Sequence, residues 1–246
     1  MSLAHVTIGD GPPVTFLHGF TQTGRTWLPV IEALDNRMTS TLIDAPGHGD
    51  STNGQRTLYE TAQDIAGVMS PGALVGYSMG ARMALHTALI APHKVTTLVL
   101  ISGTAGIDSA EDRQIRRDSD RVLAQHLIEI GVPDFIEEWL ALPMFSNLHR
   151  DDANIPERLR NTAQGLADSL TYAGTGTQDP LWDQLHTLKM PVLIIAGADD
   201  HKFVAHAQRL SGLIGESTLH VVANAGHTVH LEQNKVFSEI FRSFVA

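Results

Sequence analysis

The chain of 246 residues has no cysteine, which excludes disulfides, a thiolate nucleophile and any cysteine-based metal site. No apolar run approaches the roughly 20 residues that a helix needs to span a bilayer. The N-terminus lacks the charged-then-apolar pattern of a signal peptide. Basic residues are in deficit, since 17 Lys and Arg face 27 Asp and Glu for a formal net charge of −10. Broad nucleic-acid binding needs a dominant basic surface. We therefore expect a soluble cytoplasmic protein with neither nucleic acid nor membrane as a partner.

What the chain does contain is enough apolar sequence, 43% of its residues, for one sizeable core. Apolar runs rich in β-branched residues alternate with helical patterns, as is typical of a parallel sheet. The sequence therefore predicts an α/β fold, with a mostly parallel central sheet flanked by helices. The expected strands cover residues 14–17, 39–43, 73–75, 97–101, 192–196 and 218–222, and the expected flanking helices cover 26–34, 58–69, 79–90, 203–213 and 229–244.

The alternation stops in the middle of the chain. Between residues 103 and 190 the pattern has a helical period and no convincing strand, and it predicts helices over 110–129, 134–141, 156–164 and 167–172. A helical insertion that folds over the strand ends would act as a lid. We expect the core to be formed by residues 1–103 and 186–246, and the helical lid by residues 104–185.

The most informative segment is Gly76-Tyr77-Ser78-Met79-Gly80, which lies between a predicted strand and a predicted helix. A Gly-x-Ser-x-Gly sequence in that setting forms a nucleophile elbow, a tight turn that holds the serine at the carboxyl end of the sheet. The turn also places Ser78 at a helix N-terminus, where the backbone dipole favours developing negative charge. Ser78 is the predicted nucleophile or base.

Serine needs a neighbour that takes its proton and a third group that fixes this neighbour's tautomer. Downstream of Ser78, Asp199 and Asp200 follow one predicted strand, and His227 follows the last. We assign His227 as the base and Asp200 as the acid, with Asp199 as the rival acid. The N–H groups of Phe20 and Met79 are the predicted oxyanion donors, in the loop after the first core strand and directly after the nucleophile.

Two histidine-containing segments invite other interpretations. His227-x-x-His230-x-Glu232 has some character of a metal site, but no second ligand group is evident, so we expect no metal and no organic cofactor. Asp44 and His48 are expected to shape a loop, since a buried aspartate often accepts hydrogen bonds from backbone N–H groups.

Several segments together resemble the α/β-hydrolase superfamily over nearly the whole chain. They are His18-Gly19-Phe20, Asp44-x-Pro46-Gly47-His48-Gly49-x-Ser51, the elbow around Ser78, Asp200 and Gly226-His227, in order at predicted strand ends. The resemblance implies an α/β-hydrolase fold with an inserted helical lid.

Cationic side chains near the elbow point to an anionic substrate. Arg82 lies four residues after Ser78, on the same helix face. Arginine matches carboxylates bidentately, although a structural ion pair is an equal alternative for this residue. Arg160 and Lys202 could add positive charge. A further basic stripe on the lid comprises Arg113, Arg116, Arg117 and Arg121, but the neighbouring Asp112, Asp118 and Asp120 could pair with it on a solvated face.

A narrower resemblance covers both core and lid. Gly76 to Arg82, Ser102-Gly103-x-x-Gly106, the Arg116 region, Trp139 with Pro143-Met144-Phe145, and Asp200-x-Lys202-Phe203 are similar to the 2-succinyl-6-hydroxy-2,4-cyclohexadiene-1-carboxylate synthases of menaquinone biosynthesis. This resemblance implies a lyase that eliminates pyruvate from an anionic polycarboxylate substrate. It implies that Arg82, Arg116, Arg160 and Lys202 bind the carboxylates, and that Tyr77 and Trp139 shape the pocket.

Two other functions are alternatives. A serine hydrolase acting on an anionic ester or a carbon–carbon bond would use the same triad. A ligand receptor on this fold is the second alternative, but the presence of Ser78, Asp200 and His227 argues against it, because a receptor needs no general base. We expect a monomer or a small homo-oligomer.

Overall fold

A single mixed sheet organises the chain in the computed structural model, which describes residues 3–35 and 37–245. Seven strands lie in the order β1-β3-β2-β4-β5-β6-β7, and every neighbouring pair except β1 and β3 is parallel. The six predicted strands are confirmed to within two residues at each end. The strands are β1 His5–Ile8, β2 Pro13–Leu17, β3 Thr39–Ile43, β4 Gly72–Tyr77, β5 Val95–Ile101, β6 Val192–Gly197 and β7 Ser217–Val222.

Strand β1 is absent from the sequence-based prediction. It has only four residues, and these alternate between exposed and half-buried positions at the sheet edge. The central strands β4 and β6 are buried along their whole length, as expected for parallel strands covered on both faces. An edge strand gives a much weaker apolar signal than a central one.

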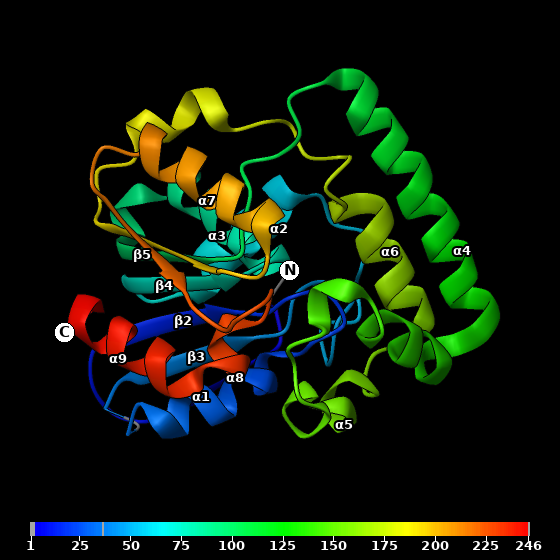
Figure 1. Cartoon of the computed structure of the whole chain (residues 1–246), viewed down its shortest axis with the longest axis horizontal. Helices are drawn as coiled ribbons and strands as arrows, with labels where there is room; N and C mark the ends of the chain where they lie inside the picture. The colour runs from blue at the N-terminus through cyan, green and yellow to red at the C-terminus, as the bar shows by residue number, and fades with distance from the viewer. Residues whose placement is uncertain (1–2, 36, 246) are drawn as a thin grey trace.

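Helices cover both faces of the sheet (Figure 1). On one face lie α2 (Leu58–Val68), α3 (Met79–Ile90) and α7 (His201–Leu213). On the other lie α1 (Leu28–Ala33), α8 (Val229–Glu232) and α9 (Asn234–Val245). Each face therefore buries its own apolar layer.

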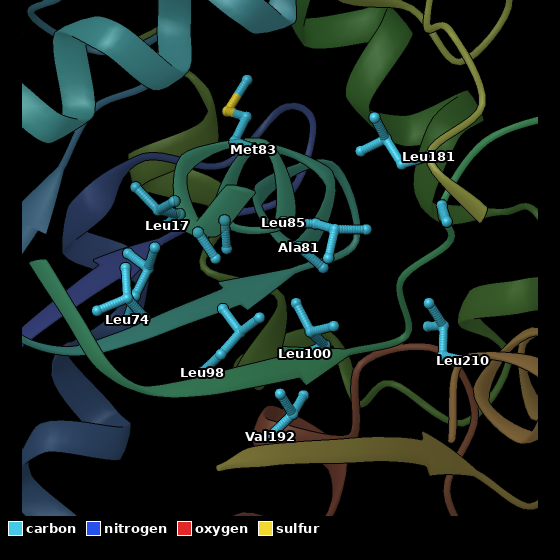
Figure 2. Packing of buried hydrophobic residues seen from close by; sticks show 14 of the residues in the cluster. Leu17, Leu74, Ala81, Met83, Leu85, Leu98, Leu100, Leu181, Val192 and Leu210 are labelled. Atoms are coloured by element: carbon cyan, nitrogen blue, oxygen red, sulfur yellow. The ribbon is translucent and has the colours of Figure 1, made fainter. Parts of the chain in front are cut away.

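The apolar layer around α3 fixes the helix that follows Ser78. Figure 2 shows Leu74, Leu98 and Leu100 of the central strands packed beneath the helix that carries Ala81 and Leu85. All these side chains are almost completely buried. The position of Ser78 is thus set by a fully buried part of the core.

Two predicted core helices differ from the structure. The helix expected over 229–244 is two helices, because the backbone leaves helical geometry at Gln233 (φ −129°, ψ 50°). The helix expected over 26–34 begins as a 3₁₀ turn, Gly24–Trp27, before α1. Pro29 lies in the first turn of α1, where its missing N–H costs no helical hydrogen bond.

Between β5 and β6 the chain forms helices that lie beyond one end of the sheet (Figure 1). Helix α4 spans Ala110–Leu140 and is interrupted at Gly131 (φ 80°), so the two helices expected over 110–129 and 134–141 follow one another. It packs against α6 (Ala163–Ala173) through buried residues that include Leu127, Phe135, Leu166 and Leu170.

The helix expected over 156–164 is wrong. Helix α5 covers only Ile155–Arg158, and α6 then begins at Ala163 after its N-cap Thr162, whose hydroxyl accepts the Gly165 N–H. Between them the Asn161 side chain bonds the backbone of other loops, which competes with helix formation.

Candidate active site

Ser78 lies in a sharp turn between β4 and α3. Its backbone has φ 52° and ψ −106°, a region that non-glycine residues seldom adopt. A Cβ atom at Gly76 would lie 2.3 Å from the Gly80 carbonyl oxygen, and one at Gly80 would lie 2.2 Å from the Leu17 oxygen. The two glycines therefore allow the close backbone approach that the turn requires.

Three side chains from distant segments form one hydrogen-bonded chain. His227 Nε2 lies 2.9 Å from Ser78 Oγ, and His227 Nδ1 lies 2.6 Å from Asp200 Oδ2. The rival Asp199 is exposed and accepts a hydrogen bond from Asn147 Nδ2. Asp200, and not Asp199, therefore contacts His227. These distances allow a proton to pass from Ser78 to His227.

The loop after β2 is held by the His18 ring. His18 Nε2 accepts the Ala45 N–H at 3.0 Å, so Nδ1 carries the hydrogen that is donated to the Gly19 oxygen at 2.8 Å. Complete burial lowers the pKa of His18 to about 4 and keeps the ring neutral. The loop conformation next to Phe20 is thus fixed by a neutral histidine.

The two predicted oxyanion donors both border the space above Ser78. In the described part of the chain, the Phe20 N–H bonds no other backbone group. Met79 is the first residue of α3, so its N–H has no carbonyl one turn earlier within the helix. Both N–H groups are available to a ligand.

A cavity of about 220 Å³ lies over Ser78 and His227. Its wall contains the predicted substrate-binding residues Arg82, Arg116, Trp139 and Lys202. The other residues that line it are Phe20, Met79, Thr104, Met144, Ser169, Leu170, Ala173, Gly174, Thr175 and Phe203. Core and lid residues from distant parts of the chain thus enclose the same space.

Arg82 is only 7% exposed. Its Nη1 donates to the Ala173 oxygen at 2.9 Å and to Gln178 Oε1 at 3.4 Å, and no carboxylate among the described residues forms an ion pair with it. Burial, together with the positive charge of Arg116, lowers the pKa of Arg82 to about 10. Arg82 therefore stays charged at neutral pH without the structural ion pair that its sequence position also allowed.

Only one arginine of the predicted lid stripe reaches the cavity. Arg116 lines it while its Nε donates to Asp120 Oδ1 at 2.8 Å. Arg113 donates to the Ile107 and Asp108 carbonyls, Arg117 to the Gly176 carbonyl, and Arg121 pairs with Asp118. The expected pairing with aspartates is thus found at Arg116 and Arg121.

Trp139, which belongs to α4, and Lys202, which belongs to α7, both line the cavity. The Trp139 ring lies 5.2 Å from that of Phe20, and its buried indole Nε1 has no hydrogen-bond partner within the described structure. Lys202 is exposed at the start of α7, beside Phe203, whose ring lies 4.5 Å from the His227 ring. Trp139 thus offers a free donor, and Lys202 a charge accessible from solvent.

Two residues predicted to bind substrate, Tyr77 and Arg160, are not among those that line the cavity. Tyr77 is 3% exposed and packs behind His227, with its ring 4.5 Å from that of His230. Burial raises the pKa of Tyr77. Arg160 pairs with Asp50 at 2.8 Å and Glu157 at 3.0 Å.

Sequence reasoning overlooked Ser169 and Thr104, buried hydroxyl groups that line the cavity. It also overlooked Arg158, which is 1% exposed. No motif or period in the sequence separates these residues from ordinary lid and loop positions.

Neither a cluster of metal ligands nor a membrane-spanning helix is found among the described residues. Within them, no group of three or more His, Asp or Glu side chains could hold a metal ion. Glu232 instead accepts the N–H groups of Gly226 and Thr228. None of the described helices combines the length and apolar character needed to cross a bilayer.

The sequence of the chain is similar to those of a known protein family. Residues 16–240 match the model of the Alpha/beta hydrolase family. The 2-succinyl-6-hydroxy-2,4-cyclohexadiene-1-carboxylate synthase of Serratia proteamaculans is 33% identical over 96% of this chain and 94% of its own. A Bacillus subtilis protein that carries the same name provisionally is 34% identical over 100% of this chain and 99% of its own.

Solved structures agree with these sequence matches. MenH from S. aureus superposes with a TM-score of 0.88 at 29% identity, covering 99% of this chain and 98% of that one. A thermophilic esterase from Thermogutta terrifontis, with malate bound, has a TM-score of 0.85 over 98% of this chain and 92% of its own. At 24% identity, the esterase supports the fold alone.

Proposed function

Because this chain belongs to the alpha/beta hydrolase family, and because it is similar to the synthases named above over nearly their whole length, we propose that it is a 2-succinyl-6-hydroxy-2,4-cyclohexadiene-1-carboxylate synthase. The enzyme is a carbon–oxygen lyase of menaquinone biosynthesis. It eliminates pyruvate from 2-succinyl-5-enolpyruvyl-6-hydroxy-3-cyclohexene-1-carboxylate and consumes no water. The observation that carries the proposal is the hydrogen-bonded Ser78 and His227 beneath a cavity whose buried Arg82 pairs with no carboxylate among the described residues.

The proposed reaction begins with proton transfer. His227 Nε2 accepts the Ser78 proton, and the Ser78 oxygen removes a proton from the carbon next to the succinyl carbonyl. The electron pair from that C–H bond forms an enolate. As this enolate collapses, a ring C=C bond forms at the deprotonated carbon, the existing ring C=C bond shifts one position toward the carbon that bears the enolpyruvyl group, and the C–O bond to that group breaks. The departing pyruvate enolate takes up the proton held by His227 Nε2 and becomes pyruvate. Asp200 holds His227 Nδ1–H, so that Nε2 is free to accept.

The oxyanion donors stabilise the enolate in this scheme. The N–H groups of Phe20 and Met79 border the cavity, and neither bonds a backbone acceptor in the part of the chain that the structure describes. At the α3 N-terminus the helix dipole adds to their effect. Loss of one such donor slows related reactions about 10²- to 10³-fold.

The positively charged side chains of the cavity complement the negative charge of the substrate, which carries three carboxylates. Arg82 is buried and charged and forms no ion pair with a carboxylate of the described residues, so a substrate carboxylate would supply one. Arg116 and Lys202 offer positive charge elsewhere on the cavity wall. We propose that residues 104–185 act as a lid, since α4 contributes Arg116 and Trp139, and α6 contributes Ser169.

Pyruvate release tests the proposal directly. With the enolpyruvyl substrate, the wild type should form pyruvate, followed through NADH oxidation by lactate dehydrogenase, and Ser78→Ala should nearly abolish it. Consumption of substrate without pyruvate would indicate the alternative, a serine hydrolase of an anionic ester or carbon–carbon bond. No turnover at all would favour a receptor. A Ser78→Ala variant with the wild-type rate would refute the role of Ser78.

A further inference from the structure

Thr21, the residue after Phe20, has a conformation that its side chain disfavours. Its backbone φ is +68°, in the left-handed region, and the residue is completely buried. A β-branched residue seldom adopts this region, because its Cβ substituents crowd the backbone. Surrounding contacts must therefore hold Thr21 in place, and they come from the lid.

Asn161 bonds the backbone of Thr21. Its Nδ2 donates to the Thr21 oxygen at 2.6 Å and to the Arg158 oxygen at 2.9 Å, while its Oδ1 accepts the Gly49 N–H at 2.8 Å. Carbonyl oxygens only accept and the Gly49 N–H only donates, so the amide has one consistent orientation. Asn161 is 6% exposed and thus shielded from competing water.

Arg158 bonds the side chain of the same residue. Its Nη1 donates to Thr21 Oγ1, and its Nε donates to the Ala153 oxygen at 2.7 Å. No carboxylate in the described part of the chain forms an ion pair with Arg158, although it is 1% exposed. A buried cation without a counter-ion is costly. Its hydrogen bonds hold the lid segment and the loop after β2 together.

We propose that Asn161 and Arg158 are positioning residues, which hold Thr21 in the left-handed conformation and so aim the Phe20 N–H at the enolate oxygen. This inference rests on the proposed function. Neither residue lines the cavity, so each acts on the substrate only through the loop. The lid segment that contains Arg158 and Asn161 thereby determines whether the Phe20 N–H is in place to form the oxyanion site.

The test removes one hydrogen bond at a time. Asn161→Asp keeps the acceptor for the Gly49 N–H but cannot donate to the Thr21 oxygen. We expect kcat for pyruvate release to fall about 10- to 100-fold, no more than the roughly 10²- to 10³-fold loss of a whole oxyanion donor because the donor is displaced and not removed, with KM within about threefold of wild type. Gln164→Glu is the matched control, an amide-to-acid change at an exposed lid position, and should retain wild-type kcat.

A comparison at Thr21 separates positioning from simple stabilisation. Thr21→Val and Thr21→Gly both lose the Arg158 bond, but only glycine adopts positive φ without strain. We expect Thr21→Gly to keep kcat within about fivefold and the more conservative Thr21→Val to lose at least about tenfold. In the Thr21→Gly background, Asn161→Asp should cost less than about threefold further, a coupling that independent structural effects would not produce.

Three results would overturn the inference: wild-type kcat in Asn161→Asp, an equal loss in both backgrounds, or a Thr21→Gly variant slower than Thr21→Val. The Thr21 comparison decides the matter if Asn161→Asp does not fold. If the wild type releases no pyruvate, the proposed function has failed. A crystal structure of Asn161→Asp then tests the inference about Thr21. Departure of Thr21 from positive φ would support it, and an unchanged φ would overturn it.

Discussion

Replacing Asp200 with asparagine should change a proton's position while leaving the fold intact. Asp200 Oδ2 faces His227 Nδ1 at 2.6 Å, whereas Oδ1 accepts the Phe203 N–H as the N-cap of α7. Asparagine is an equally good N-cap, so its oxygen takes over the Oδ1 position. Its NH₂ group then faces Nδ1, which must become an acceptor.

The changed tautomer puts the imidazole hydrogen on Nε2, facing Ser78 Oγ at 2.9 Å. His227 can then no longer accept the serine proton. We expect kcat for pyruvate release to fall about 10³- to 10⁴-fold, or about 4–5.5 kcal/mol of transition-state stabilisation. The lactate dehydrogenase-coupled assay measures this directly, and the melting temperature should change by only a few degrees.

Asp199→Asn is the matched control, because Asp199 is the adjacent aspartate and its side chain bonds only Asn147 in the described structure. It should retain kcat within about threefold, since the hydrogen-bonded chain through His227 is untouched. A folded Asp200→Asn variant that keeps kcat within tenfold of wild type, or an Asp199→Asn variant with the larger loss, would refute this reasoning.

Two further predictions concern buried charge. Arg82→Met should lower kcat/KM about 30- to 1,000-fold, because removing one partner of a buried charge pair costs about 2–4 kcal/mol; a loss below threefold would contradict anion binding there. Acid should destabilise the fold, because burial lowers the pKa values of His18, His48, His86 and His230 to about 4, 3, 4 and 3 from 6.5. Below pH 6.5 the unfolded chain binds more protons, so stability is lost as pH falls toward 4, by up to about 5 kcal/mol per pH unit for four groups. Urea unfolding at pH 7, 6 and 5 measures this, and equal free energies at pH 7 and 5 would contradict it.

The parts of the site that local sequence could predict are those attached to the sheet. Ser78, Asp200 and His227 follow the strands β4, β6 and β7, which run parallel and bring their carboxyl ends to one edge of the sheet. The amphipathic and glycine-rich signals that mark these strand ends depend only on nearby residues. Once the strands were predicted, the three triad residues could therefore be expected to lie close together.

Residues outside these strand ends could not be placed in the same way. Tyr77 adjoins Ser78, but it belongs to β4 and packs on the far side of His227. Arg160 follows a helix that ends early, because Asn161 bonds other loops, and the guanidinium meets Asp50 instead of the cavity. Each outcome depends on contacts between segments more than a hundred residues apart.

By itself, the sequence determined the six parallel strands of the sheet, the elbow and the order of nucleophile, acid and base, because period, turn chemistry and strand ends are local properties. Only the tertiary structure decided which cations face the cavity, that no carboxylate of the described residues forms an ion pair with Arg82, and that lid residues bond Thr21. The direction of a long side chain depends on the partners that packing brings near it, and these lie far away in the chain.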